Sequence, residues 1–236
     1  MIVARSLAFN ALATVWTVVI HVLALPCLVH PAAVFAAGRL WSRVVLALLA
    51  GIVGLRYRAI GLERCPRGAL YAVKHQSTWE TMALPLMLGN PVYVLKRELT
   101  WVPLFGWYMK RIGAIPVDRS GGAKALRAMM AAARAAAAAK RPIVIFPEGT
   151  RTVPGERRAY QPGVAALYVR LELPVIPVAL NSGLFWGRRQ FIKRPGRIVV
   201  ELLPAIPPGL DCETFMATLR ERIEGATGRL IVEGKA

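Results

Sequence analysis

Two long apolar runs open the chain. The first, Leu7–Leu25 (LAFNALATVWTVVIHVLAL), contains no charged side chain. As a helix it would be about 28 Å long at about 1.5 Å per residue, close to the thickness of a bilayer's hydrocarbon core. Pro26 and Pro31 interrupt it, and the shorter run Val44–Leu55 follows. Twelve residues are too few to span a bilayer unless the helix starts nearer Pro31. We predict a helical hairpin that dips into one leaflet, or one span plus an interfacial helix.

From about residue 56 the pattern changes to short β-type runs that alternate with helical ones. The predicted strands are apolar and mostly bounded by Pro or Gly: Tyr57–Leu62, Ala69–Val73, Pro91–Leu95, Ala114–Val117, Ile143–Phe146, Val175–Leu180 and Arg197–Leu203. The predicted helices are Thr78–Leu88, Val102–Arg111, Gly122–Lys140, Val164–Leu171 and Glu213–Thr227, with Ser120 marking the start of the third and Asp211 capping the last. Such strands are typical of a sheet covered on both faces. The alternation predicts an α/β domain, a largely parallel sheet of about seven strands with flanking helices, preceded by an N-terminal membrane-associated helical hairpin.

Charge separates the same two parts of the chain. The sequence carries 31 Lys and Arg against 13 Asp and Glu, a net charge of +18. Residues 1–58 contain five arginines and no acid. We therefore divide the chain into membrane-anchoring helices, residues 1–58, and a folded domain, residues 59–236. The arginines that follow the first apolar run place this domain on the cytoplasmic side of the membrane. An apolar content of 56% excludes disorder and favours an anionic lipid surface over nucleic acid as the partner.

Two further features of the sequence indicate the cellular compartment of the protein. A secretory signal could be cleaved after Val34-Phe35-Ala36, but the second apolar run follows immediately and favours an anchor. The three cysteines, Cys27, Cys65 and Cys212, are far apart and in no metal-ligand spacing. They indicate a reducing compartment and no disulfide framework.

The first candidate for chemistry is His75, which follows the apolar run ending at Val73. In an open α/β sheet, chemistry collects where strands end and helices begin. If a helix begins near Ser77, Glu80 lies about one turn in, where its carboxylate can fold back toward the imidazole. A carboxylate that holds one ring nitrogen leaves the other free to act as a general base. The same spacing also fits a capping box of Ser77 and Glu80 beside an ordinary histidine.

The second candidate is Phe146-Pro147-Glu148-Gly149-Thr150-Arg151, again directly after an apolar run. A Gly-containing loop with a hydroxyl and an arginine can present backbone N–H groups and a guanidinium to a phosphate. The same residues also make an ordinary surface turn. The chain lacks a Walker lysine pattern and G-x-G-x-x-G, which disfavours nucleotide-binding folds. A third segment, Lys96-Arg97-Glu98-Leu99, places two more bases just past a strand.

Taken in order, these segments resemble the 1-acyl-glycerol-3-phosphate acyltransferases of the glycerolipid acyltransferase family. The resemblance covers roughly half of the chain, from about residue 65 to 185. The family's first block is histidine, four residues and aspartate, and here Glu80 stands in the place of the aspartate. The other blocks are matched by Lys96–Leu99 with Pro103, Gly106 and Val117-Asp118-Arg119, by Phe146–Arg151, and by Val175–Ala179. Four blocks in this order are a specific match, although each alone would be weak.

The resemblance implies transfer of a fatty acyl group from an acyl thioester to the sn-2 hydroxyl of 1-acyl-glycerol-3-phosphate. The product would be phosphatidic acid for phospholipid biosynthesis. His75 would be the general base, oriented by Glu80. Lys96 or Arg97 would stabilise the oxyanion. The acceptor would bind at Glu148, Gly149, Thr150 and Arg151, with Arg151 on its phosphate and Glu148 ordering either the loop or the glycerol.

The implied donor is acyl-ACP, the thioester of acyl carrier protein, or acyl-CoA, and the basic charge of the chain could steer either acidic partner. No cofactor and no metal is expected, because one histidine outside the anchor is a poor ligand set. The implied location is the bacterial inner (cytoplasmic) membrane, with the acyltransferase catalytic domain on its cytoplasmic face.

Two other classes of function remain open. One is an acyltransferase acting on another lysolipid, such as a lyso-aminolipid. The other is a non-enzymatic basic module that binds anionic membranes or nucleic acid through six arginines: Arg157, Arg158, Arg188, Arg189, Arg194 and Arg197. Such charge runs are usually solvated faces, and aromatic residues do not interleave with these arginines as stacking platforms would require. The module also leaves His75 and Glu80 unexplained, so acyl transfer without nucleic acid is the prediction.

Overall fold

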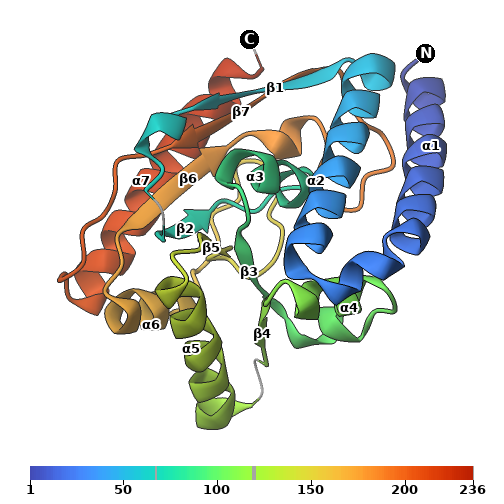
Figure 1. Cartoon of the computed structure of the whole chain (residues 1–236). Coiled ribbons are helices and arrows are strands. Elements are labelled where there is room, and N and C mark those ends of the chain that lie inside the picture. Colours follow the sequence, from blue (N-terminus) through green and yellow to red (C-terminus); the bar gives the residue numbers. More distant parts are fainter. Residues whose placement is uncertain (67, 119–120, 236) are drawn as a thin grey trace.

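A single sheet forms the centre of the molecule (Figure 1). The computed structural model describes residues 1–66, 68–118 and 121–235. Seven strands lie within these ranges, in the order β1-β7-β6-β2-β5-β3-β4. They are β1 Leu55–Ile60, β2 Leu70–Val73, β3 Val92–Lys96, β4 Ile115–Val117, β5 Ile143–Ile145, β6 Val175–Leu180 and β7 Gly196–Leu202. All neighbouring pairs are parallel except β6 and β7, which are antiparallel. The prediction of a largely parallel sheet of seven strands with flanking helices is confirmed.

The helices lie close to their predicted positions. They are α3 Trp79–Leu88, α4 Phe105–Arg111, α5 Gly122–Ala138, α6 Pro162–Leu171 and α7 Cys212–Glu233. α4 begins three residues later than predicted, because Val102, directly before Pro103, is extended and Leu104 has φ +62°. Asp211 caps α7 as predicted, its carboxylate accepting a 2.9 Å hydrogen bond from the Thr214 backbone N–H. The predictions at Arg119 and Ser120 lie outside the described residues.

The sheet is covered on both faces because both sets of alternating side chains are apolar. Along β2, Leu70 and Ala72 pack with α5, α6 and α7 in one core cluster. Tyr71 and Val73 point the other way and pack with α1, α2 and α3 in a second cluster. Helices on both faces follow from this pattern, since each face needs an apolar partner. Figure 1 shows the two layers, with α7 on one side and α2 and α3 on the other.

The N-terminal hairpin belongs to the second of these clusters. α1 spans Ile2–Leu23, and a 3-10 helix, Leu25–Val29, connects it to α2, Pro31–Leu48, which continues through a π-helical turn to Val53. The second helix starts at Pro31, so it is longer than its apolar run. Within the described residues, Ile2–Leu23 and Pro31–Val53 are each long and apolar enough to cross a membrane by length and composition. Their inner faces, through Phe9 and Leu49, share a core with the sheet.

Candidate active site

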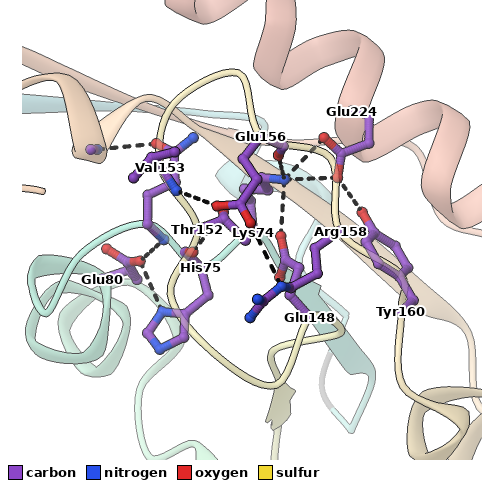
Figure 2. Close-up of polar contacts among 12 residues, drawn as sticks. Lys74, His75, Glu80, Glu148, Thr152, Val153, Glu156, Arg158, Tyr160 and Glu224 are labelled. Carbon is purple, nitrogen blue, oxygen red and sulfur yellow. Dashed lines mark hydrogen bonds and ion pairs between the residues drawn. The ribbon is translucent and has the colours of Figure 1, made fainter. Parts of the chain in front are cut away.

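The predicted site residues lie where the central strands end. β2, β3, β5 and β6 run in the same direction, so their carboxyl ends meet at one edge of the sheet. His75 follows β2, Lys96 ends β3, and the loop of residues 146–151 follows β5. Figure 2 shows His75 and Glu80 beside the segment that contains Glu148 and Thr152. Three segments that are far apart in the sequence are therefore neighbours in the fold.

Glu80 holds the His75 ring. Glu80 Oε1 lies 3.0 Å from His75 Nδ1 and also accepts hydrogen bonds from the backbone N–H groups of Gln76, at 2.6 Å, and Ser77, at 2.7 Å. The Glu80 side chain is completely buried. The dyad and the capping arrangement that the sequence left as alternatives are thus formed by the same carboxylate. A buried carboxylate with several donors fixes the imidazole and leaves Nε2 available.

Three contacts that the sequence did not indicate hold this pair and the neighbouring Gln76 in place. Ser182, two residues after the end of β6, donates a 3.0 Å hydrogen bond from Oγ to Glu80 Oε2. The Gly183 backbone N–H donates to Gln76 Oε1, also at 3.0 Å. The His75 ring stacks on Phe146, with ring centroids 3.9 Å apart and planes inclined by 20°. The place of Ser182 at the end of a buried strand was the one signal in the sequence that could have indicated it.

Beside the dyad lies a buried charge cluster centred on Lys74, the residue before His75 (Figure 2). Lys74 Nζ is 3.0 Å from Glu148 Oε1 and 2.8 Å from Glu224 Oε1, on α7. Tyr160 donates a 3.0 Å hydrogen bond to the same Glu224 oxygen. Burial raises the pKa of Glu148, and the charge of Lys74 opposes that rise. Of the two roles considered for Glu148, ordering the loop and binding the glycerol, its contacts favour ordering the loop.

The loop after β5 is tied directly to the His75 backbone. The Thr152 N–H and Oγ1–H both donate to the His75 carbonyl oxygen, at 2.8 and 3.1 Å. Arg151 Nη1 donates a 2.6 Å hydrogen bond to Thr78 Oγ1, at the start of α3. Gly149 has φ +65°, a left-handed conformation that a side chain disfavours, and so permits the tight turn. The guanidinium therefore lies beside the first turn of α3.

The two bases at the end of β3 are placed differently. Lys96 lines the same cavity as His75 and Arg151. Arg97 is ion-paired with Asp118, at 2.5 Å, and its guanidinium lies 5.3 Å from the centre of the Trp101 ring. The structure thus brings Lys96 to the candidate site, whereas Arg97 contacts neighbouring segments.

A cavity of about 940 Å³ connects the site with the N-terminal hairpin. His75, Gly149, Thr150 and Arg151 line one part of it. Much of the remaining lining is apolar and comes from α1, α2, β3 and α4, including Ile20, Val34, Phe35, Leu95, Met109 and Ile112. Ordinary ligand pockets measure about 300–1,000 Å³, so this one can take a large apolar ligand. In the part of the chain that the structure describes, no group of three or more His, Cys, Asp or Glu side chains could hold a metal ion.

A model of the Acyltransferase family matches residues 56–181, more than half of the chain. The chain belongs to the acyltransferase family. This acyltransferase is 35% identical to the 1-acyl-sn-glycerol-3-phosphate acyltransferase of Pseudomonas aeruginosa over 194 residues, which cover 82% of this chain and 76% of that protein. It is 30% identical to the enzyme of the same name from Limnanthes douglasii over 171 residues, 72% of this chain and 61% of that one.

A solved structure confirms the fold. The 1-acyl-sn-glycerophosphate (LPA) acyltransferase of Thermotoga maritima matches with a TM-score of 0.77 at 20% sequence identity, covering all of this chain and 96% of that one. The predicted family membership is confirmed by the family match and the Pseudomonas relative. Ser182 and Glu224 lie outside the residues that the family model matches, although both contact the residues around His75.

Proposed function

We propose that this acyltransferase transfers a fatty acyl group from an acyl thioester to the sn-2 hydroxyl of 1-acyl-glycerol-3-phosphate and so forms phosphatidic acid. The observation that carries the proposal is the His75–Glu80 pair at a cavity that is apolar at one end and lined by Arg151 at the other. A lysolipid phosphate offers the matching chemistry, a charged head on an apolar chain. The names of the Pseudomonas and Limnanthes relatives agree with this substrate.

In the proposed mechanism His75 is the general base. Nε2 takes the proton of the acceptor hydroxyl while the oxygen attacks the carbonyl carbon of the thioester. Glu80 stabilises the imidazolium that forms. Collapse of the tetrahedral intermediate breaks the carbon–sulfur bond, and the imidazolium returns its proton to the leaving thiolate. No covalent enzyme intermediate, metal or other cofactor is needed.

We assign the oxyanion to Lys96, the cationic side chain from the end of β3 that lines the cavity. The Asp118 carboxylate engages Arg97, so Arg97 is proposed to order the end of β3. Acyl-ACP and acyl-CoA are the proposed donors. A net charge of +18 favours the approach of either acidic molecule.

Arg151→Ala tests the substrate assignment. A charge-assisted contact to phosphate is worth about 1.5–3 kcal/mol, so we expect kcat/KM for lysophosphatidate to fall roughly ten- to hundredfold. Arg151→Lys should recover only part of this, because an ammonium keeps the charge and loses the planar fork. The measurement is initial rates of acyl transfer with purified protein and a panel of lysolipid acceptors.

Two controls separate phosphate binding from loop support. Thr78→Val removes the hydrogen-bond partner of Arg151 and leaves the guanidinium, so it should cost much less than Arg151→Ala. Monoacylglycerol, an uncharged acceptor, should be acylated equally by wild type and Arg151→Ala. An equal loss on charged and uncharged acceptors would mean that Arg151 supports the loop, and would favour a lyso-aminolipid or another lysolipid as the substrate.

We further propose that the hairpin holds the protein on the bacterial inner membrane, with the catalytic domain on the cytoplasmic face. The outer face of α1 exposes four valines and one leucine: Val3, Leu7, Val15, Val18 and Val22. We expect the full-length chain to remain in the inner-membrane pellet after a high-salt wash, since apolar burial is insensitive to screening. Proteases added outside spheroplasts should not cleave the domain. Release of the protein by salt alone would show that charge holds it on the membrane, and would contradict the proposed apolar anchor.

A further inference from the structure

A tight turn after β6 presents two arginines at its tip. The Gln190 backbone N–H donates to the Gly187 carbonyl at 3.3 Å, and the Gly187 N–H donates to Gln190 Oε1 at 3.2 Å. Arg188 and Arg189 occupy the two central positions of this turn. Both side chains are exposed, as predicted for a solvated arginine patch, and both also line the cavity that contains His75.

The backbone of the turn is unfavourable for its own sequence. Arg189 has φ +57°, in the left-handed region that Gly or Asn would normally occupy at the third position of a turn. Residues held in this way persist where the surrounding structure enforces them, and they cluster at ligand sites. The conformation therefore marks this turn as a candidate ligand-binding segment.

Both ends of the segment are firmly held. At its start, Ser182 and Gly183 bond to Glu80 and Gln76 of the His75 segment. At its end, Lys193 is buried, donates a 2.6 Å hydrogen bond to Asn10 Oδ1 on α1, and lies 4.8 Å from the centre of the Trp186 ring. The turn is thus fixed between the N-terminal hairpin and the candidate active site.

The arginines at the tip belong to the site of Arg151. Arg188 and Arg189 line the same cavity as His75 and Arg151. Arg188 Nη1 lies 3.5 Å from the Arg151 carbonyl oxygen, in a long hydrogen bond that places the turn beside the loop after β5. In the described parts of the chain, none of these three arginines forms an ion pair with an acid. Three guanidinium groups with no acid to neutralise them make a site for a strongly anionic group.

We propose that Arg188 and Arg189 bind the acceptor phosphate together with Arg151 and make the enzyme selective for a phosphomonoester over a phosphodiester. This inference rests on the proposed function. A phosphomonoester carries a charge of about −1.5 to −2 at pH 7 and has three terminal oxygens, whereas a diester carries a single charge. One arginine can neutralise the single charge of a diester. The additional guanidinium groups stabilise the second negative charge, which only the monoester carries. The pair would therefore favour a terminal phosphate over a phosphate that is esterified to a further headgroup.

The test replaces the guanidinium groups while keeping the turn. Arg189→Gly suits the left-handed backbone, and Arg188→Gln keeps a polar side chain of similar length. Arg194→Gln is the matched control, because Arg194 is exposed, lies four residues beyond the turn end at Gln190 and is absent from the cavity lining. Full-length enzyme is assayed with lysophosphatidate, lysophosphatidylglycerol and monoacylglycerol at saturating donor. A separate series varies the donor at saturating lysophosphatidate.

We expect kcat/KM for lysophosphatidate to fall about three- to tenfold in each single variant and about ten- to hundredfold in the double variant, mainly through KM. Values for the diester and for monoacylglycerol should change little, so the preference for the monoester shrinks. Arg194→Gln should match wild type. An equal loss on all three acceptors, no loss, or a loss confined to the donor series would overturn the inference; the last would assign the arginines to a donor phosphate.

Wild-type rates keep this test separate from that of the proposed function. If wild type prefers an acceptor without phosphate, the proposed function fails whatever the variants do. Inhibition by glycerol 3-phosphate, measured with the best acceptor, then tests separately whether Arg188 and Arg189 bind a phosphomonoester. Inhibition that is weaker in the double variant supports the pair as a phosphomonoester site, and unchanged or absent inhibition overturns it.

Discussion

His75→Ala should give a folded protein with less than about one per cent of wild-type acyl transfer, because general base catalysis is typically worth about 10²–10⁴-fold. The fold should survive, since Glu80 keeps its hydrogen bonds from Gln76, Ser77 and Ser182 after the imidazole is removed. The measurement is transfer of a radiolabelled acyl group to lysophosphatidate, with near-UV circular dichroism as the check on folding. Activity above that level in a folded variant would refute the assignment of His75 as base.

Glu80 variants distinguish a role in orienting the His75 imidazole from a role in capping α3. Glu80→Asp should retain measurable activity, and Glu80→Ala should lose most of it. Glu80→Gln is the informative neutral variant, because the amide fills the same space but cannot stabilise the imidazolium as a carboxylate does. We expect its kcat to fall while the protein stays folded. If Glu80→Ala were as active as wild type, Glu80 would be a capping residue and nothing more.

Lys74→Met should cause the largest loss of stability. The substitution leaves Glu148 and Glu224 buried without their shared cation, and breaking a buried pair in this way typically costs about 3–5 kcal/mol. Because Lys74 lowers the pKa of Glu148 against the effect of burial, its removal should raise that pKa further. A carboxyl whose pKa is raised in the folded state stabilises the protein at low pH and loses this contribution as pH rises. The deficit should therefore be smaller at pH 5 than at pH 8.

The measurement is chemical denaturation of wild type and variant at both pH values. Lys124→Met, on the exposed face of α5, is the matched control and should change little. Lys74→Met combined with Glu224→Leu should recover part of the loss, since one buried acid is then removed as well. A loss that is no larger than in the control, or that is the same at both pH values, would count against the buried charge cluster.

Local pattern predicted the sheet well because its strands are short apolar runs ended by Pro or Gly. Val175–Leu180 was predicted to the residue, while β1 begins two residues earlier than expected, at Leu55. His75 and Glu80 could be paired from sequence because five residues across a strand–helix junction fix their separation. The Gly-containing loop indicated Arg151 as a candidate phosphate contact, and the family resemblance added the oxyanion role of Lys96 or Arg97.

Residues whose roles depend on partners far away in the sequence could not be predicted from local pattern. Lys74 is a buried base whose partner Glu224 lies 150 residues away, and no local pattern indicates that pairing. Arg188 and Arg189 are exposed, as a solvated patch requires, but their place in the cavity lining depends on the distant contacts that hold the two ends of their turn. Arg97 is similar to Lys96 in sequence, yet Asp118 engages one and not the other.

Helices α1 and α2 share a core with the sheet and line the cavity, so a ligand bound there affects the stability of the purified protein. The cavity is formed only when α1 and α2 pack on the folded domain, so a long-chain molecule lying in it binds the native state and not the unfolded chain. By mass action, such a molecule at 100 times its Kd adds about 2.7 kcal/mol to the free energy of unfolding. Lipid or detergent carried through purification thus acts as a folding ligand. A melting temperature measured for this enzyme describes the protein together with whatever occupies the cavity.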